Sequence, residues 1–152
     1  MHSVTPETET KMTKTPLWYW AAATAGLIWN AYGTWQFGLS LTATPESLVA
    51  SGLTPEQAQV MTTYPAWMTL AFAIGVLGGL VGSVMLLLRH RTALPVFAAS
   101  LAGYIVLYIG DITQGVFAVM GAPQVIILTL VVAIAAGLLA VAARAKTTAL
   151  IA

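Results

Sequence analysis

The sequence predicts an all-α, polytopic membrane protein with four transmembrane helices. Hydrophobic residues make up 59% of the 152 residues and charged residues only 7%, whereas about a quarter of the residues in a soluble domain are charged. The apolar residues gather in four long segments, and the basic residues gather in stretches that precede, separate or follow these segments. These observations exclude a water-soluble globular domain and predict one small membrane bundle.

The four apolar segments cover residues 17–37, 66–88, 94–111 and 123–143. An α-helix rises about 1.5 Å per residue, so roughly 20 residues cross the ~30 Å hydrocarbon core of a bilayer. Within lipid, backbone polar groups must be hydrogen-bonded inside their own element, which favours helices. We therefore expect a four-helix membrane bundle over residues 16–146, between a mobile polar tail at 1–15 and a short tail at 147–152.

The six lysine and arginine residues set the expected orientation. They fall before the first segment, between the second and third, and after the fourth, and four crossings place all three stretches on one side. Because basic residues favour the cytoplasmic side, we expect both termini in the cytoplasm, the 38–65 loop on the opposite, outer side, and contacts between a basic set and lipid headgroups. This basic set comprises Lys11, Lys14, Arg89, His90, Arg91, Arg144 and Lys146.

Aromatic residues agree with this arrangement of the segments. Tryptophan and tyrosine are enriched at the two membrane–water interfaces, where their amphipathic rings lie at the depth of the headgroups. The sequence predicts a cytoplasmic belt at Trp18, Tyr19 and Trp20 and an outer belt at Trp35, Tyr64 and Trp67.

The outer loop contains the tripeptide TPE twice, at residues 44–46 and 54–56. A threonine N-cap, a proline at the first helical position and an acid in the first turn together indicate a helix start. Gln57 completes a capping box in the second repeat. We expect two short surface helices separated by Gly52, which serve either as a lid over the helix ends or as a loop for partner docking or substrate gating.

The second apolar segment contains two overlapping GxxxG patterns. Small residues at this spacing let two membrane helices approach closely. The short Arg89–Arg91 turn makes the second and third helices antiparallel neighbours, which favours a contact within the chain over one between chains. The predicted helix-packing set is Gly75, Gly78, Gly79, Gly82 and Ser83.

Asp111 is the last residue of the third predicted segment and the only acidic residue in any of the four. If the third helix ends near residue 111, this carboxylate lies at the outer headgroups and Ile112–Ala122 form an apolar turn. If the helix continues to Val119, the carboxylate lies inside the membrane and is a candidate proton or cation site. Tyr104, Tyr108 and Asp111 share one helix face, so we expect Tyr108 to be placed to hydrogen-bond the carboxylate.

Asn30 and Gln36 are the polar amides of the first span. An interhelical hydrogen bond is the structural interpretation of Asn30, and lining a solute path is the alternative. We group both amides with Tyr104, Tyr108 and Asp111 as a possible polar or ion site.

Several kinds of chemistry lack the residues that they need. The chain has no cysteine and no histidine within a predicted span, which excludes thiolate metal sites and bis-histidine haem. It has no nucleophile–histidine–acid set on one membrane face and no phosphate-binding loop, and its few basic residues lie too close to the membrane for nucleic acid. We therefore expect no enzyme activity, cofactor, metal or nucleic-acid partner.

The stretches TPLWYW, IWNAYG and YPAWMTLAFAIGVLGGLVGSVMLLLRHRTALPVFAASL resemble a family of small, mostly uncharacterised bacterial four-helix inner-membrane proteins. The family shares a tryptophan-rich first helix, a TPE-containing outer loop and a P-A-W entry to a glycine-rich second helix. Some members carry the label sugar transporter. The resemblance covers residues 16–108 and implies a location in the bacterial inner membrane, which would place the outer 38–65 loop in the periplasm.

Two hypotheses about function follow. In the first, the chain is a non-catalytic accessory or assembly subunit that packs against a larger membrane complex or against itself. In the second, it is a small-solute, possibly sugar, transporter that acts as an oligomer. The near absence of ionisable residues at mid-membrane favours the first, because transporters place substrate and ion sites near the bilayer midplane.

Overall fold

The structure is a computed structural model and describes residues 14–152. Lys11 and the rest of residues 1–13 of the predicted tail lie outside the described residues. The described chain forms seven α-helices and no strand, which confirms the all-α fold. Four helices are long, namely α1 (Leu17–Thr42), α4 (Ala66–Leu87), α5 (Ala93–Thr113) and α7 (Ala122–Thr147), and three are short, namely α2 (Pro45–Ala50), α3 (Pro55–Thr62) and α6 (Val116–Met120).

Three of the long helices, α4, α5 and α7, are long and apolar enough to cross a membrane. The first long helix, α1, has 26 residues but is not among them. The described residues thus contain three candidate membrane spans, and the fourth span expected at α1 stays a prediction. Both α1 and α7 run past the predicted segments, because a helix can continue through polar residues beyond the point where the apolar run ends.

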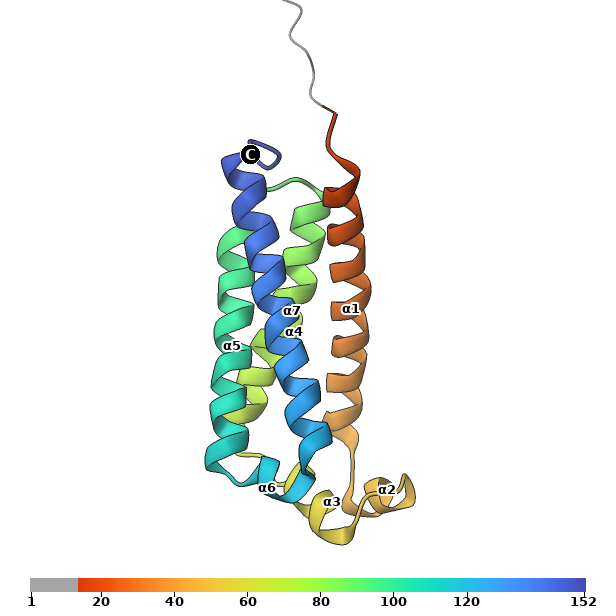
Figure 1. The fold of residues 1–152 in the computed structure, drawn as a ribbon. Coiled ribbons are helices and arrows are strands. Elements are labelled where there is room, and N and C mark those ends of the chain that lie inside the picture. The colour runs from red at the N-terminus through yellow and green to blue at the C-terminus, as the bar shows by residue number, and fades with distance from the viewer. Residues whose placement is uncertain (1–13) are drawn as a thin grey trace, which may run out of the picture.

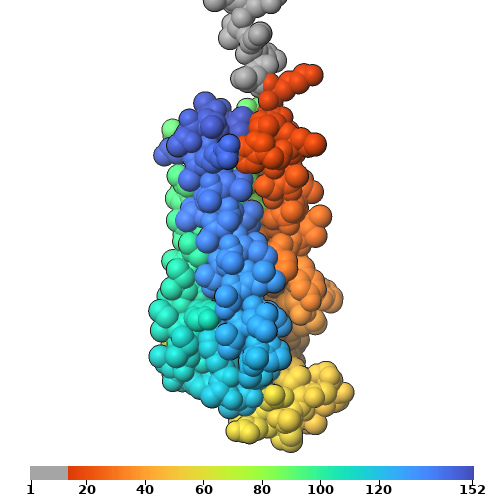
Figure 2. Space-filling view, viewed as in Figure 1, coloured from red at the N-terminus to blue at the C-terminus, as the bar shows by residue number. Residues whose placement is uncertain are grey.

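The four long helices lie side by side (Figure 1). The packing of α4 is the most extensive, against α5 and α1, and α7 packs chiefly against α5 and touches α1 less. In the space-filling view, the surfaces of α1 and α7 meet along the face shown (Figure 2). The short helices α2, α3 and α6 gather at one end, which we call the capped end, and the described basic residues lie at the opposite, basic end.

Both TPE helices form where the sequence predicts them. Thr44 and Thr54 are the N-caps of α2 and α3, and each side chain accepts a hydrogen bond from a backbone N–H three residues later. Gln57 completes the predicted capping box, and Ser47 completes a second one that the sequence analysis did not foresee. Gly52 has a φ of +111°, a left-handed conformation that suits glycine at the turn between the two helices.

The residues after α7 fold back onto the α4–α5 turn. The backbone N–H of Arg91 donates to the carbonyl of Ala152 at 2.8 Å, and the N–H of Ala152 donates to the carbonyl of Arg89 at 3.1 Å. The side chain of Ile151 is buried in the core cluster at the basic end. The predicted tail at 147–152 therefore begins one residue inside α7 and packs against the bundle.

Candidate functional site

The glycine face of α4 lies inside the chain. A Cβ atom on Gly79 would lie 1.9 Å from the Oδ1 atom of Asn30 on α1, which is closer than any real side chain allows. The other three glycines of the predicted set face α5 in the same way, and their closest side chains are Tyr104 for Gly75, Ser100 for Gly78 and Phe97 for Gly82. The close approach that the GxxxG patterns predict occurs here between helices of one chain.

A further glycine, which the sequence analysis did not assign to helix packing, lies in the same contact. A Cβ atom on Gly103 of α5 would lie 2.8 Å from the backbone oxygen of Ala71 and 2.9 Å from the backbone nitrogen of Gly75. The backbones of α4 and α5 therefore approach each other directly. A sequence signal was available, because Ser100 and Gly103 are small residues three positions apart and therefore lie on one face of the helix.

Asn30 is the polar centre of the contact between α1 and α4. Its side chain is 3% exposed. The Nδ2 atom donates to the carbonyl of Gly26 at 2.8 Å and to Ser83 Oγ at 3.5 Å, and Ser83 Oγ donates in turn to the carbonyl of Gly79 at 2.8 Å. This geometry agrees with the structural interpretation of Asn30, which is an interhelical hydrogen bond.

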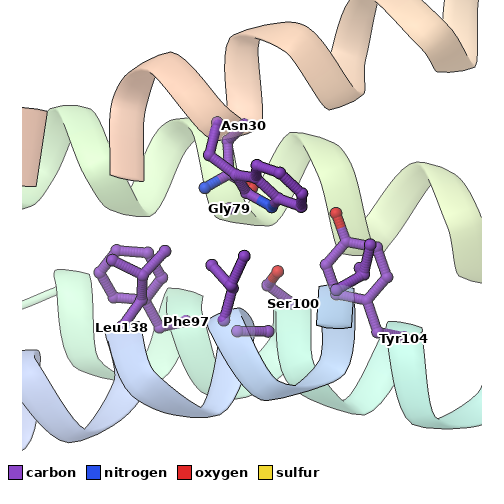
Figure 3. Close-up of a pocket in the computed structure, with 10 residues that line it drawn as sticks. Asn30, Gly79, Phe97, Ser100, Tyr104 and Leu138 are labelled. Carbon is purple, nitrogen blue, oxygen red and sulfur yellow. The ribbon is translucent and has the colours of Figure 1, made fainter. Parts of the chain in front are cut away.

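Ser100 makes a second polar link, between α5 and α4. Its hydroxyl donates to the carbonyl of Gly75 at 2.6 Å, and its side chain is buried. Figure 3 shows Asn30 on one side of the bundle and Ser100 and Tyr104 on the other, with Gly79 between the two sides. The gap between these side chains has no room for a water molecule. In this arrangement, therefore, the gap offers no aqueous path for a solute.

The residues grouped as a possible polar or ion site do not converge. Asn30 and Tyr104 lie in the interior, whereas Gln36 is exposed on α1. The Tyr108 hydroxyl lies 3.1 Å from Thr129 Oγ1 on α7, and its ring packs against Phe117 of α6. The expected hydrogen bond between Tyr108 and Asp111 is therefore not formed, because the side chain of Tyr108 turns towards α6 and α7.

Asp111 lies in the last turn of α5, and its side chain is fully buried. Its Oδ1 atom accepts a hydrogen bond from the Tyr64 hydroxyl at 3.2 Å, and its Oδ2 atom accepts one from Gln124 Nε2 at 3.0 Å. Because α5 ends at Thr113, it does not continue to Val119. The carboxylate is thus close to a helix end, as the first alternative expected, but protein covers it. We call these three side chains the Asp111 cluster.

The Asp111 cluster joins three parts of the capped end. Tyr64 lies in the connection between α3 and α4, Asp111 ends α5, and Gln124 lies in the first turn of α7. Burial raises the pKa of Tyr64 well above its usual range, and the charge of Asp111 and the hydrogen bond to it raise this pKa further. Tyr64 therefore stays protonated and serves as a donor at every ordinary pH. The sequence analysis missed Tyr64 and Gln124, which lie 47 and 13 residues from Asp111 along the chain.

The basic end holds the predicted headgroup set. The described members, which are Lys14, Arg89, His90, Arg91, Arg144 and Lys146, are all exposed. Three of them also contact other residues of the chain. The Arg144 guanidinium lies 5.2 Å from the centre of the Trp18 ring, Arg89 Nε donates to the carbonyl of Leu150 at 2.8 Å, and His90 Nδ1 accepts a hydrogen bond from the backbone N–H of Thr92 at 3.2 Å. Within the predicted cytoplasmic belt, the side chain of Tyr19 turns into the core instead and donates to the carbonyl of Leu86.

Within the described residues, no group of three or more histidine, cysteine, aspartate or glutamate side chains is placed to hold a metal ion. Comparison with protein-family models, with curated proteins and with solved structures found no match. The fold and the three apolar helices therefore define the class, a helical membrane protein, without assigning a family.

Proposed function

We propose that this chain is a non-catalytic accessory or assembly subunit that packs against a larger membrane complex or against itself. The observation that carries the proposal is the closed interior. Every fully enclosed side-chain polar atom of the described residues has a hydrogen-bond partner within the chain. The central gap beside Asn30, Ser100 and Tyr104 has no room for water. A bundle of this kind supports packing better than passage of a solute.

In this proposal α1 is the fourth membrane span. Its 26 residues extend about 39 Å, which is enough to cross a ~30 Å hydrocarbon core. The helix lies alongside the three apolar helices in Figure 1. The basic end then faces the cytoplasm by the positive-inside rule, and α2, α3 and α6 lie on the outer surface. The family resemblance supports a bacterial inner membrane.

A small-solute transporter that acts as an oligomer is the second candidate function. One observation favours it, namely the fully buried carboxylate of Asp111 at the capped end, where none of the described basic residues lies. Buried ionisable groups in membrane proteins often belong to ion or proton paths. Transport assays with purified protein in proteoliposomes test this candidate. A solute flux that is driven by a pH gradient and abolished by Asp111→Asn would establish the transporter function and contradict the accessory function.

Purification in a gentle detergent at native expression level tests the accessory function. We expect the chain to travel in an assembly several times larger than the monomer, whose other subunits mass spectrometry identifies. A wild-type chain that runs as a lone monomer would contradict the proposal.

A further inference from the structure

The basic end carries positive charge that no carboxylate of the described residues balances. The three acidic residues of the described chain all lie at the capped end, in α2, α3 and the last turn of α5. An uncompensated cluster of cations attracts anionic ligands, either soluble anions or the headgroups of a membrane. The exposed lysine and arginine residues of this end are Lys14, Arg89, Arg91, Arg144 and Lys146.

Exposed apolar side chains lie among these cations. Leu17 and Leu88, which are 83% and 73% exposed, are the most exposed large hydrophobic side chains of residues 14–152. Leu17 begins α1 and Leu88 is the C-cap of α4, and both helix ends lie at the basic end (Figure 1). The rings of Trp18 and Trp20 are also exposed there. Leucine and tryptophan beside cations suit the boundary between acyl chains and headgroups, which favours a lipid over a soluble anion.

Arg144 is the cation best prepared to bind a phosphate. Its guanidinium lies over the Trp18 ring, 5.2 Å from the ring centre, in the one cation–π contact among residues 14–152. An arginine held over an aromatic face keeps the N–H donors at its edge free, and these donors match two phosphate oxygens in a bidentate pair. Arg89 is less suitable, because its Nε atom already donates to the carbonyl of Leu150.

We propose that Arg144 and Trp18 form a binding site for the phosphate of an anionic phospholipid in the leaflet that faces the basic end. Arg144 binds the phosphate, and Trp18 is a positioning residue that holds the guanidinium at the depth of the headgroups. The exposed side chain of Leu17 lies among the acyl chains. The site goes beyond the proposed function and does not depend on it, because it requires only that the basic end faces a bilayer surface.

Lipid binding by the purified full chain tests the site. Native mass spectrometry gives the dissociation constants of phosphatidylglycerol and phosphatidylcholine with matched acyl chains, and we expect the anionic lipid to bind at least about tenfold tighter. Arg144→Gln should raise the dissociation constant of phosphatidylglycerol about tenfold, as expected for lost hydrogen bonds to a charged group. Trp18→Leu keeps an apolar side chain but removes the ring, so it should raise this constant about two- to fivefold and leave that of phosphatidylcholine unchanged.

Lys146→Gln is the matched control. It removes the same charge from α7, but two positions along an α-helix lie about 200° apart, so Lys146 does not share the face on which Arg144 meets Trp18. We expect Lys146→Gln to raise the dissociation constant of phosphatidylglycerol at least about threefold less than Arg144→Gln does.

Equal effects of Arg144→Gln and Lys146→Gln would overturn the site, because diffuse charge would then explain the affinity. Equal binding of the two lipids by the wild type would overturn it as well. Tighter binding of inorganic phosphate than of phosphatidylglycerol would show that the ligand is a soluble anion and not a lipid. A chain that runs as a lone monomer and still prefers phosphatidylglycerol through Arg144 would contradict the accessory function but support the lipid site.

Discussion

Substitution of Gly79 by alanine tests how tightly α1 and α4 pack. The new Cβ atom would lie 1.9 Å from Asn30 Oδ1, and an ordinary contact begins at 3.4 Å, so the amide must move by about 1.5 Å. Such a shift breaks the 2.8 Å hydrogen bond from Asn30 to Gly26. Overpacking costs about 1–3 kcal/mol, and the loss of this hydrogen bond within α1 costs about a further 0.5–1.5 kcal/mol. We expect Gly79→Ala to lower the free energy of unfolding by about 2–3 kcal/mol.

The assay is a titration with a denaturing detergent, followed by the fluorescence of the five tryptophans. Gly137→Ala is the control, because its Cβ atom has nothing within 4 Å, and it should change the free energy of unfolding by no more than about 1 kcal/mol. The double variant Gly79→Ala with Asn30→Ala removes the clashing amide, so it should recover about 1–2 kcal/mol relative to the sum of the single variants. Equal effects of Gly79→Ala and Gly137→Ala, or strict additivity in the double variant, would refute the proposed contact.

Three further predictions concern the other polar links. Asp111→Leu leaves two donors, Tyr64 and Gln124, without their acceptor, so it should destabilise the capped end by about 1–3 kcal/mol for each donor and increase hydrogen exchange there. Asp111→Asn keeps an acceptor and should destabilise the capped end less. Equal hydrogen exchange in the two variants would contradict this prediction. Ser100→Ala removes the hydroxyl that donates to the carbonyl of Gly75, so it should lower the free energy of unfolding by about 0.5–1.5 kcal/mol. An unchanged value would show that this hydrogen bond contributes nothing. The pKa of Tyr64 is raised by burial and by Asp111, so its contribution to stability should be complete below pH about 10 and be lost as the pH rises further. Tyr64→Phe should therefore lose less stability at alkaline pH than the wild type does. The same loss of stability in both proteins would exclude Tyr64 as its source.

Local signals in the sequence predicted much of the fold. The TPE helix starts at Thr44 and Thr54 depend on side chains three residues away, so a short stretch of sequence contains all the necessary information. The long helices were likewise predicted from apolar runs, within a few residues at most ends. The extension of α1 to Thr42 was missed because hydrophobicity marks the membrane core and not the end of the helix.

The candidate site was less predictable, because it depends on which helix faces meet. Asn30 and the glycines of α4 were each singled out, but the sequence did not show that Asn30 lies against Gly79. Tyr64 was expected in an aromatic belt, yet its hydroxyl donates to Asp111, 47 residues away. Only the folded bundle brings these two residues together. Gln36 was grouped with the polar residues by composition, and only the rotation of α1 shows that it faces outwards.

The closed interior is the central claim, and the accessibility of buried serines to water tests it most directly. Because the chain has no cysteine, the variants Ser83→Cys and Ser100→Cys each carry one thiol at a buried position, and Ser51→Cys carries one at an exposed position. A membrane-impermeant maleimide should label Ser51→Cys and leave Ser83→Cys and Ser100→Cys unlabelled from both sides of the membrane. Labelling of either buried position at a rate within about tenfold of Ser51→Cys would reveal an aqueous path through the bundle and contradict the account.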